Sequence, residues 1–178
     1  MAGLADKTRI PSAPLDIGFL REALRRVAST VHVVALKRED GCFFATTATA
    51  VVAVSFDPPT LLVCLNRSSM IAGAILQEDV FTISTLNAGQ HDVAKACAGQ
   101  VEHEKRETFF GRGSKVQNAP VLIGAQAHFV CRRVHAAIHG THAIVLGETI
   151  DVSSRPAIEP LLYLNGTYGG FRPNRTGP

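Results

Sequence analysis

The most constraining feature of this sequence is that its strand-like segments follow one another instead of alternating with helices. The segments with β-branched or alternating character are residues 31–40, 42–56, 60–65, 80–86, 128–140, 142–154 and 161–171. Antiparallel neighbours need only a short turn between them, whereas parallel strands need a crossover that is usually a helix. The order therefore excludes a doubly wound α/β fold. It predicts a mainly β protein, an antiparallel barrel with a few helices packed on it.

Helical signals are restricted to three short segments. In residues 17–29, apolar side chains recur at spacings of three and four, and Asp16 stands where an N-cap is expected. The other two segments are residues 68–79, which begin with two serines, and residues 88–99, which end at a glycine. We expect these helices to be accessories to the barrel.

The chain length predicts a single domain, because domains usually contain ~100–200 residues and this chain has 178. Residues 1–15 contain two prolines and little periodicity, so we expect a flexible N-terminal arm. Residues 16–172 form the folded domain, and residues 173–178 form a C-terminal tail. Within the domain, residues 100–120 are polar and are expected to form a long excursion outside the core.

Composition argues against several classes of partner. The formal net charge is only +3 and the basic residues are dispersed, so no nucleic-acid-binding patch is expected. No apolar run approaches the ~18 residues of a membrane span, and residues 1–16 lack the apolar core of a secretory signal. The four cysteines form no C-x-x-C pair, which predicts reduced thiols in a cytoplasmic protein and no zinc site.

Three histidines have a spacing that would suggest metal ligands on a helix. His135, His139 and His142 lie at i, i+4 and i+7. Their segment is β-branched and interrupted by Gly140, so the periodicity is not helical. We therefore expect no metal site.

Two polar stretches are unusual on physical grounds. Residues 46–50 (TTATA) combine small side chains with hydroxyls, so a flat ligand can approach the backbone there; the alternative is an exposed, threonine-rich strand face. Residues 66–69 (NRSS) offer an arginine, hydroxyls and backbone N–H groups to a phosphate; the alternative is an ordinary helix cap. Together they predict a mononucleotide-like ligand.

The run TATAVVAVSFDPPTLLVCLNRSS (residues 47–69) resembles the flavin reductase-like family, the reductase components of two-component flavin monooxygenases. In that family a T-A-x-A segment, an S-x-x-P-P turn and an N-x-S element recur in this order. Weaker similarities extend the resemblance over residues 17–172. The resemblance implies an antiparallel Greek-key split barrel of the FMN-binding type, which forms a homodimer and binds flavin near the subunit interface.

The resemblance also implies roles for individual residues. Those expected to contact the flavin ring and ribityl chain are Thr47, Ala48 and Thr49, with Ser55 and Phe56 at the ring edge. Those expected to hold the phosphate are Asn66, Arg67, Ser68 and Ser69, and Phe109 and Tyr168 match further positions near the flavin. His142 ends a Gly-Thr-His triplet where the family has G-D-H, and is expected to position the nicotinamide. Ser84 stands where many members carry Asn.

The function implied is an NAD(P)H:flavin oxidoreductase that uses FMN or FAD, with NADH or NADPH as co-substrate. The reduced flavin or its electrons would pass to a partner monooxygenase component, or to a Co(II) corrin such as cob(II)yrinic acid a,c-diamide. The alternative is a non-enzymatic flavin-binding protein that carries electrons on the same barrel.

Overall fold

The computed structural model describes residues 14–100, 103–112, 116 and 119–174. Its main element is a seven-stranded sheet in which every neighbouring pair is antiparallel. Its strands are β2 (His32–Lys37), β3 (Phe43–Ala48), β4 (Val51–Phe56), β5 (Pro59–Asn66), β6 (Val80–Thr85), β9 (Ala127–His139) and β10 (His142–Ser154). The mainly β, antiparallel prediction is therefore confirmed.

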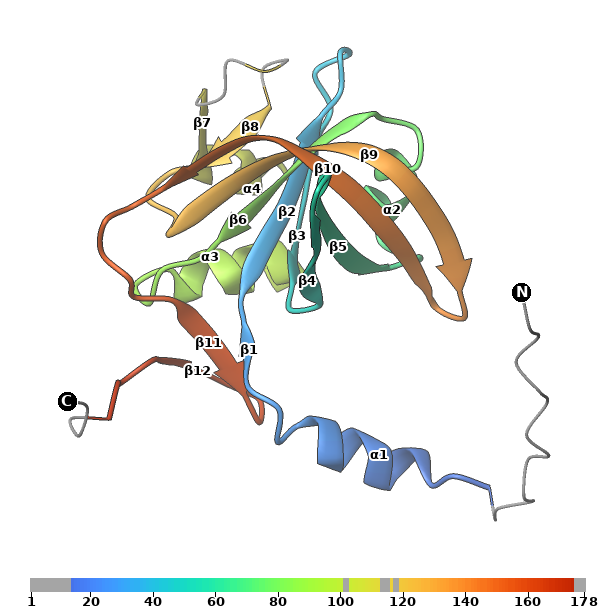
Figure 1. The fold of residues 1–178 in the computed structure, drawn as a ribbon, viewed down its shortest axis with the longest axis vertical. Helices are drawn as coiled ribbons and strands as arrows, with labels where there is room; N and C mark the ends of the chain where they lie inside the picture. Colours follow the sequence, from blue (N-terminus) through green and yellow to red (C-terminus); the bar gives the residue numbers. More distant parts are fainter. Residues whose placement is uncertain (1–13, 101–102, 113–115, 117–118, 175–178) are drawn as a thin grey trace.

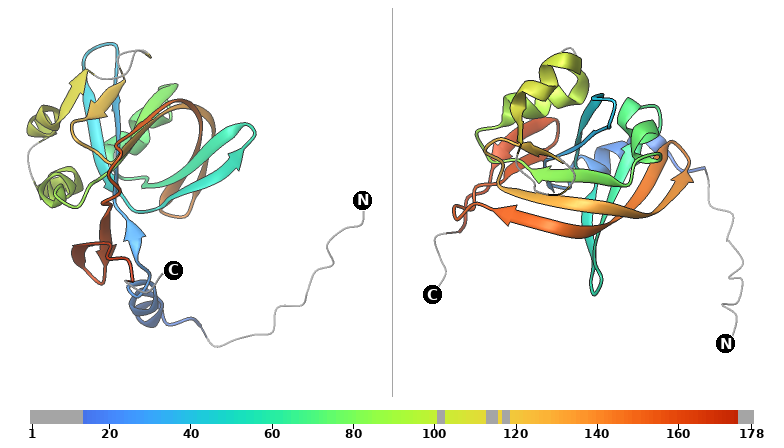
Figure 2. Two further views of the ribbon diagram at one scale, coloured as in Figure 1. Left: turned by 60° about the vertical axis from the view of Figure 1, so that its left-hand side comes forward. Right: turned by 90° about the horizontal axis from the view of Figure 1, so that it is seen from above.

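The sheet is curled into a barrel that is open along one seam. The strand order is β3-β2-β6-β9-β10-β5-β4, which puts β3 and β4 at opposite edges. Only Thr49 and Ala50 separate these two strands in the sequence, so the two edges must come together in space. No ladder joins β3 to β4 among the described residues. This architecture agrees with the expected split barrel (Figures 1 and 2).

Two smaller sheets flank the barrel. One joins β1 (Ser29–Thr30), β11 (Leu161–Leu164) and β12 (Thr167–Gly170), and the other joins β7 (Phe110–Arg112) to β8 (Pro120–Leu122). Asn165 and Gly166 connect β11 to β12 with φ values of 49° and 82°, as a two-residue type I′ turn requires. Strand β7 lies within the segment expected as a polar excursion, and β8 begins at the last residue of that segment, so part of the segment is ordered as strand.

The helices are short. They are α1 (Ile17–Leu24), α2 (Met70–Ile75), α3 (His91–Lys95), which continues into a wider turn at Ala96–Gln100, α4 (His103–Arg106) and a 3-10 turn at Glu107–Phe109. Asp16 caps α1 as predicted, because its carboxylate accepts from the backbone N–H groups of Gly18 at 2.8 Å and Phe19 at 3.3 Å. Within the described residues, none of the helices is both long and apolar enough to cross a bilayer.

The core consists of two apolar clusters on opposite sides of β2. Val34 and Leu36 belong to the cluster inside the barrel, which is closed by the buried face of α2. Val33 and Ala35, on the other face of the strand, belong to a second cluster with α3, β8 and β11. Because both faces of β2 are covered, its residues 32–36 are all buried.

Gly147 has the closest side-chain neighbours of the glycines in the described residues. It lies on β10 at an irregularity in the pairing with β9. A Cβ atom at this position would come within 2.6 Å of Phe81 Cζ and 2.8 Å of Cys131 Cβ. The barrel therefore depends on a glycine at this position.

Two histidines, the buried His32 and the half-buried His128, have hydroxyl partners. The Nδ1 atom of His32 lies 3.1 Å from Thr85 Oγ1, and burial lowers the pKa of His32 to about 4. The Nδ1 atom of His128 lies 3.0 Å from Ser84 Oγ, and burial also lowers the pKa of His128. The imidazole of His32 is therefore neutral at pH 7.

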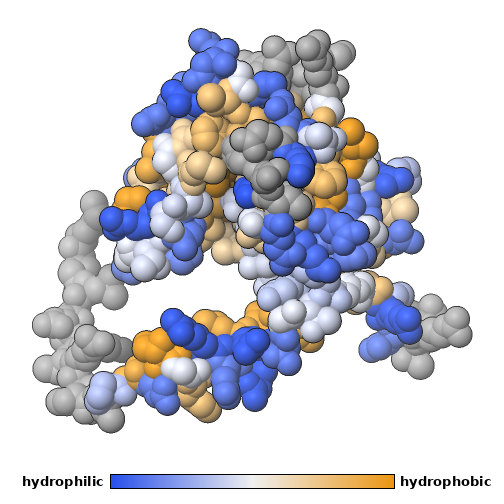
Figure 3. Space-filling model, turned by 180° about the vertical axis from the view of Figure 1, so that it is seen from behind, coloured by the Kyte–Doolittle hydropathy of each residue, from blue (hydrophilic) through white to orange (hydrophobic). Residues whose placement is uncertain are grey.

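Helix α1 has no buried residue, although its apolar stripe is the one predicted from the sequence. Its exposed apolar side chains include Phe19 at 70% and Leu24 at 60% of full exposure. Figure 1 shows α1 apart from the barrel, and Figure 3 shows hydrophobic side chains on the same projecting segment. A helix of eight residues is marginal by itself in water, so this stripe needs a partner that the described chain does not supply.

Candidate functional site

A cavity of about 240 Å³ lies at the barrel seam, between the ends of β3 and β5. It is lined by Thr46, Thr47, Ala48, Thr49, Ala50, Cys64, Leu65, Asn66, Ser69 and His142. The structure therefore brings together the two polar stretches singled out in the sequence. None of the lining residues carries a carboxylate, so the cavity can accept an anionic ligand without charge repulsion.

The β3 side of the cavity is a wall of small side chains fixed from behind. The Thr47 hydroxyl donates to the backbone oxygen of Ala94 in α3 at 2.6 Å, which ties the end of β3 to the second apolar cluster. Ala48 is buried in the barrel, and Thr49 is exposed where the chain leaves the strand. With the Thr47 hydroxyl engaged, this wall offers a ligand mainly backbone and small side-chain surface.

The loop after β5 is shaped by its own hydrogen bonds. Asn66 Oδ1 accepts from the backbone N–H of Ser68 at 3.0 Å and from its hydroxyl at 2.9 Å. The Ser69 hydroxyl donates to the Asn66 backbone oxygen at 2.6 Å and accepts from the Ala72 N–H at 3.4 Å as the N-cap of α2. The helix-cap alternative thus describes Ser69 correctly, and both serine hydroxyls are engaged within the loop.

Arg67 is the exposed cation of this loop. Its backbone N–H donates to the Thr141 oxygen at 3.0 Å, which fixes the loop to the β9–β10 turn. Its guanidinium makes a long contact of 3.4 Å from Nη1 to the Gly140 oxygen. Arg67 forms no salt bridge within the described part of the chain, so its charge is available to an anion.

His142 lies at the same end of the cavity. It is the first residue of β10 and pairs directly with Asn66 on β5, so the two side chains share one face of the sheet. Its Nδ1 atom lies 2.9 Å from Thr141 Oγ1. Its Nε2 atom makes no hydrogen bond to any of the described residues, which leaves one ring nitrogen for a ligand.

Six of the expected flavin contacts are not among the residues that line this cavity. Two of them, Arg67 and Ser68, stand in the loop between the lining residues Asn66 and Ser69, and the other four lie elsewhere. Ser55 and Phe56 lie at the far end of β4, where the Ser55 hydroxyl accepts from the Asp57 N–H at 3.0 Å and Phe56 is 90% exposed. Phe109 and Tyr168 pack against the second apolar cluster. Burial raises the pKa of Tyr168, with a smaller effect of Tyr163, whose ring centroid lies 5.2 Å away. The flavin contacts expected of these four residues stay predictions.

Two lining residues, Cys64 and Leu65, were not expected from the sequence as ligand contacts. Thr46 and Ala50 belong to the small polar stretch recognised in the sequence, although no individual role was expected of them. Cys64 stands two residues before Asn66 on the same strand, and therefore on the same face of the sheet. The alternation of side chains along a strand could therefore have indicated from the sequence that Cys64 lies beside Asn66.

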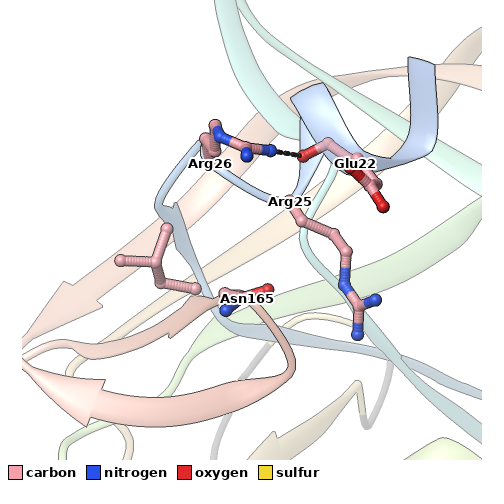
Figure 4. Close-up of a pocket in the computed structure, with 5 residues that line it drawn as sticks. Glu22, Arg25, Arg26 and Asn165 are labelled. Carbon is pink, nitrogen blue, oxygen red and sulfur yellow. Dashed lines mark hydrogen bonds between the residues drawn. The ribbon is translucent and has the colours of Figure 1, made fainter. Parts of the chain in front are cut away.

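A larger cavity, about 520 Å³, lies elsewhere, between α1 and the β11–β12 turn (Figure 4). It is lined by Glu22, Arg25, Arg26, Leu164 and Asn165. None of these residues was predicted to touch a ligand, and Leu164 is the only lining residue without a polar side chain. The seam cavity is therefore the better candidate for binding a flat ring.

Comparisons with known proteins identify the family and agree with the fold. The sequence model described as "Flavin reductase like domain" matches residues 24–172. This chain belongs to the flavin reductase-like family.

Curated relatives match over nearly their full lengths. The FMN reductase (NADH) RutF of Stutzerimonas stutzeri (strain A1501) is 33% identical over 160 residues, which cover 90% of this chain and 91% of that protein. The reductase component of the FADH(2)-dependent resorcinol hydroxylase of Rhizobium sp. (strain MTP-10005) is 33% identical over 164 residues, with 90% and 91% coverage.

Solved structures share the fold. The NADH:FAD oxidoreductase SgcE6 of Streptomyces globisporus C-1027, in complex with NAD and FAD fragments, has a TM-score of 0.82 at 28% identity and covers 98% of this chain and 99% of its own. BorF, the flavin reductase component of a bacterial two-component tryptophan halogenase, has a TM-score of 0.80 at 28% identity, with 89% and 100% coverage.

Proposed function

We propose that this protein is an NADH-dependent flavin reductase that reduces FMN or FAD and supplies reduced flavin to a separate acceptor. The observation that carries the proposal is the seam cavity, which has small side chains on one wall and Asn66, Ser69 and His142 at one end. The exposed Arg67 stands in the loop between Asn66 and Ser69, beside the cavity. The relatives named as NADH-dependent reductases of FMN and FAD support both cofactor and co-substrate. Four free cysteines support a cytoplasmic location.

The residues present fit a flavin mononucleotide. The small side chains of residues 46–50 let a planar ring lie against the backbone of β3, and Arg67 can neutralise a phosphate at the other end. When bound, the flavin supplies the hydride acceptor for the reduced nicotinamide. Because the hydride would pass directly between the two cofactors, the reaction needs no acidic side chain, and the cavity lining contains none.

The chain contributes binding and orientation. The bond from Thr47 to Ala94 holds the ring-binding wall in place, and the turn made by Asn66 and Ser68 holds Arg67 at the rim. Thr141 fixes the ring of His142 through Nδ1, and Nε2 is then free to hydrogen-bond the carboxamide of the nicotinamide. We assign His142 to positioning of the co-substrate.

We also infer that the functional unit is a homodimer. Ligand pockets usually enclose about 300–1,000 Å³, so the seam cavity of about 240 Å³ is too small to enclose a whole nucleotide. The β4–β5 hairpin projects from the sheet (Figure 2) and carries exposed Val52, Val54 and Phe56. This hairpin in a second copy can cover the cavity, which would bring Ser55 and Phe56 to the flavin across the interface.

Sedimentation tests this assembly. The protein should sediment as a dimer, and Phe56→Ser should weaken both the dimer and flavin binding, because one apolar contact supports both. A monomer with full flavin affinity would contradict the inference.

The acceptor we favour is a partner monooxygenase, since one relative is the reductase component of a hydroxylase and BorF serves a halogenase. A Co(II) corrin is the second candidate from the sequence. Anaerobic assay of Co(I) formation with NADH and flavin separates the two. Corrin reduction no faster than free reduced flavin achieves leaves the monooxygenase partner.

One experiment tests the reductase itself. The absorption spectrum of the purified protein reports bound flavin, and NADH oxidation is then followed with and without added FMN or FAD. A reductase oxidises NADH rapidly, and added flavin stimulates it. Tightly held flavin with negligible NADH oxidation would instead identify a non-enzymatic electron carrier.

A further inference from the structure

The β9–β10 hairpin carries a pair of histidines that the proposed reaction uses only in part. His142 pairs directly with His139 across the hairpin and with Asn66 on the other side. Directly opposed residues of antiparallel strands place their Cβ atoms ~4.5–5.5 Å apart on one face. Asn66, His142 and His139 therefore form a row across three adjacent strands, which begins in the lining of the seam cavity.

The surroundings of this row favour an anion. His139 and His142 are both exposed, and Arg67 contacts the Gly140 oxygen in the turn that joins the two strands. None of the three takes part in a salt bridge within the described ranges of the chain. The described residues also contain no group of three or more His, Cys, Asp or Glu able to hold a metal ion.

The length of the row indicates which anion it suits. Neighbouring strands lie ~4.7–4.9 Å apart, so the row extends ~10 Å from Asn66 to His139. The phosphate of a mononucleotide would occupy the end near Asn66 and Arg67. His139 lies beyond it on the next strand, where the second phosphoryl group of a longer ligand would lie.

We propose that His139, together with Arg67, forms a second anion subsite beside His142 that binds the diphosphate of a dinucleotide. The proposal rests on the proposed function for the identity of its ligands. Two dinucleotides carry this chemistry, FAD and NADH, and each has a mononucleotide counterpart that lacks the diphosphate, FMN and reduced nicotinamide mononucleotide. His139 is then a binding residue that distinguishes dinucleotides from mononucleotides.

Equilibrium binding tests the subsite independently of turnover. Dissociation constants of all four ligands are measured by fluorescence titration for the unmodified protein and for His139→Gln. We expect His139→Gln to weaken one dinucleotide about fivefold and its mononucleotide less than twofold, the loss typical of one exposed contact to a charged group. His139→Arg should restore the affinity, because a guanidinium also binds phosphate.

His135→Gln is the matched control. His135 is exposed on the same face of β9, four residues from His139, and pairs with Leu146 instead of His142. Selective loss of FAD or of NADH identifies which dinucleotide uses the subsite. Equal losses for dinucleotide and mononucleotide, no loss for either, or the same loss in His135→Gln would overturn the proposal. Absence of NADH oxidation by the unmodified protein would refute the reductase function, while these titrations would still decide the subsite.

Discussion

Arg67→Ala is the substitution that most directly tests the phosphate end of the site. The side chain is exposed, and its one hydrogen bond, to the Gly140 oxygen, is long at 3.4 Å. The contact that fixes the loop uses the backbone N–H of Arg67 and the Thr141 oxygen, and alanine retains it. The variant should therefore fold normally and lose only the charge at the rim.

The magnitude follows from the exposure of the guanidinium. A hydrogen bond to a charged group contributes about 1.5–3 kcal/mol, and solvent screening at an exposed site reduces this to about 1–2 kcal/mol. Because 1.4 kcal/mol corresponds to a factor of ten, FMN should bind roughly 5–30-fold more weakly to Arg67→Ala. Riboflavin has no phosphate, so its dissociation constant should change by less than about twofold.

Flavin fluorescence titration with FMN and riboflavin measures both constants. The FMN affinity of the unmodified protein should also fall as salt is added, and the variant should show a weaker salt dependence. Arg132→Ala is the control for net charge, because Arg132 is exposed on β9 opposite Glu148, away from the seam cavity. Equal weakening of FMN and riboflavin, or the same effect in Arg132→Ala, would refute the phosphate assignment.

Three further outcomes are expected. Gly147→Ala should lower the melting temperature by roughly 2–12 °C, since overpacking against Phe81 costs about 1–3 kcal/mol. Gly73→Ala is the control, because a Cβ atom there has nothing within 4 Å and should not lower the melting temperature. Calorimetry of the two variants compares these temperatures. Burial lowers the pKa of His32 from 6.5 to about 4, so between these pH values the unfolded chain binds a proton that the folded chain does not. The free energy of unfolding therefore decreases as the pH falls through this range. The loss should be about 2 kcal/mol at pH 5 in urea denaturation, and an equal loss in His32→Gln would contradict the assignment. His142→Ala should raise the KM for NADH about tenfold and that for flavin much less, whereas equal effects would rule out nicotinamide positioning.

Local sequence patterns predicted most strands but not how the barrel opens. The β-branched run of residues 42–56 continues without a turn signal, yet the chain leaves β3 and enters β4 at Thr49 and Ala50. That break is set by the meeting of the two sheet edges, which depends on contacts far along the chain. Helix α1 shows the converse limit, because its stripe predicts an apolar face but does not identify what covers it.

The candidate site was predictable in its parts and not in its assembly. The two polar stretches were recognised from residue type, and the structure brings both to one cavity. The neighbour relation of Asn66, His142 and His139 follows from strand register, which pairs residues distant in sequence. Ser84, which the resemblance led us to regard as a departure from the family pattern, is fully buried against His128. The family motif gave the position of this serine but not its surroundings.

The hydroxyl of Thr47 is committed to Ala94, and those of Ser68 and Ser69 are committed to their own loop. In the proposed function these three hydroxyls are not free for a bound ring, which would lie against main-chain groups that every amino acid possesses. Substitutions can accumulate around such a wall during evolution without altering which chromophore it accepts. Proteins that share an ancestor can thus evolve to serve different electron acceptors through changes at the rim, while they continue to bind the same flavin.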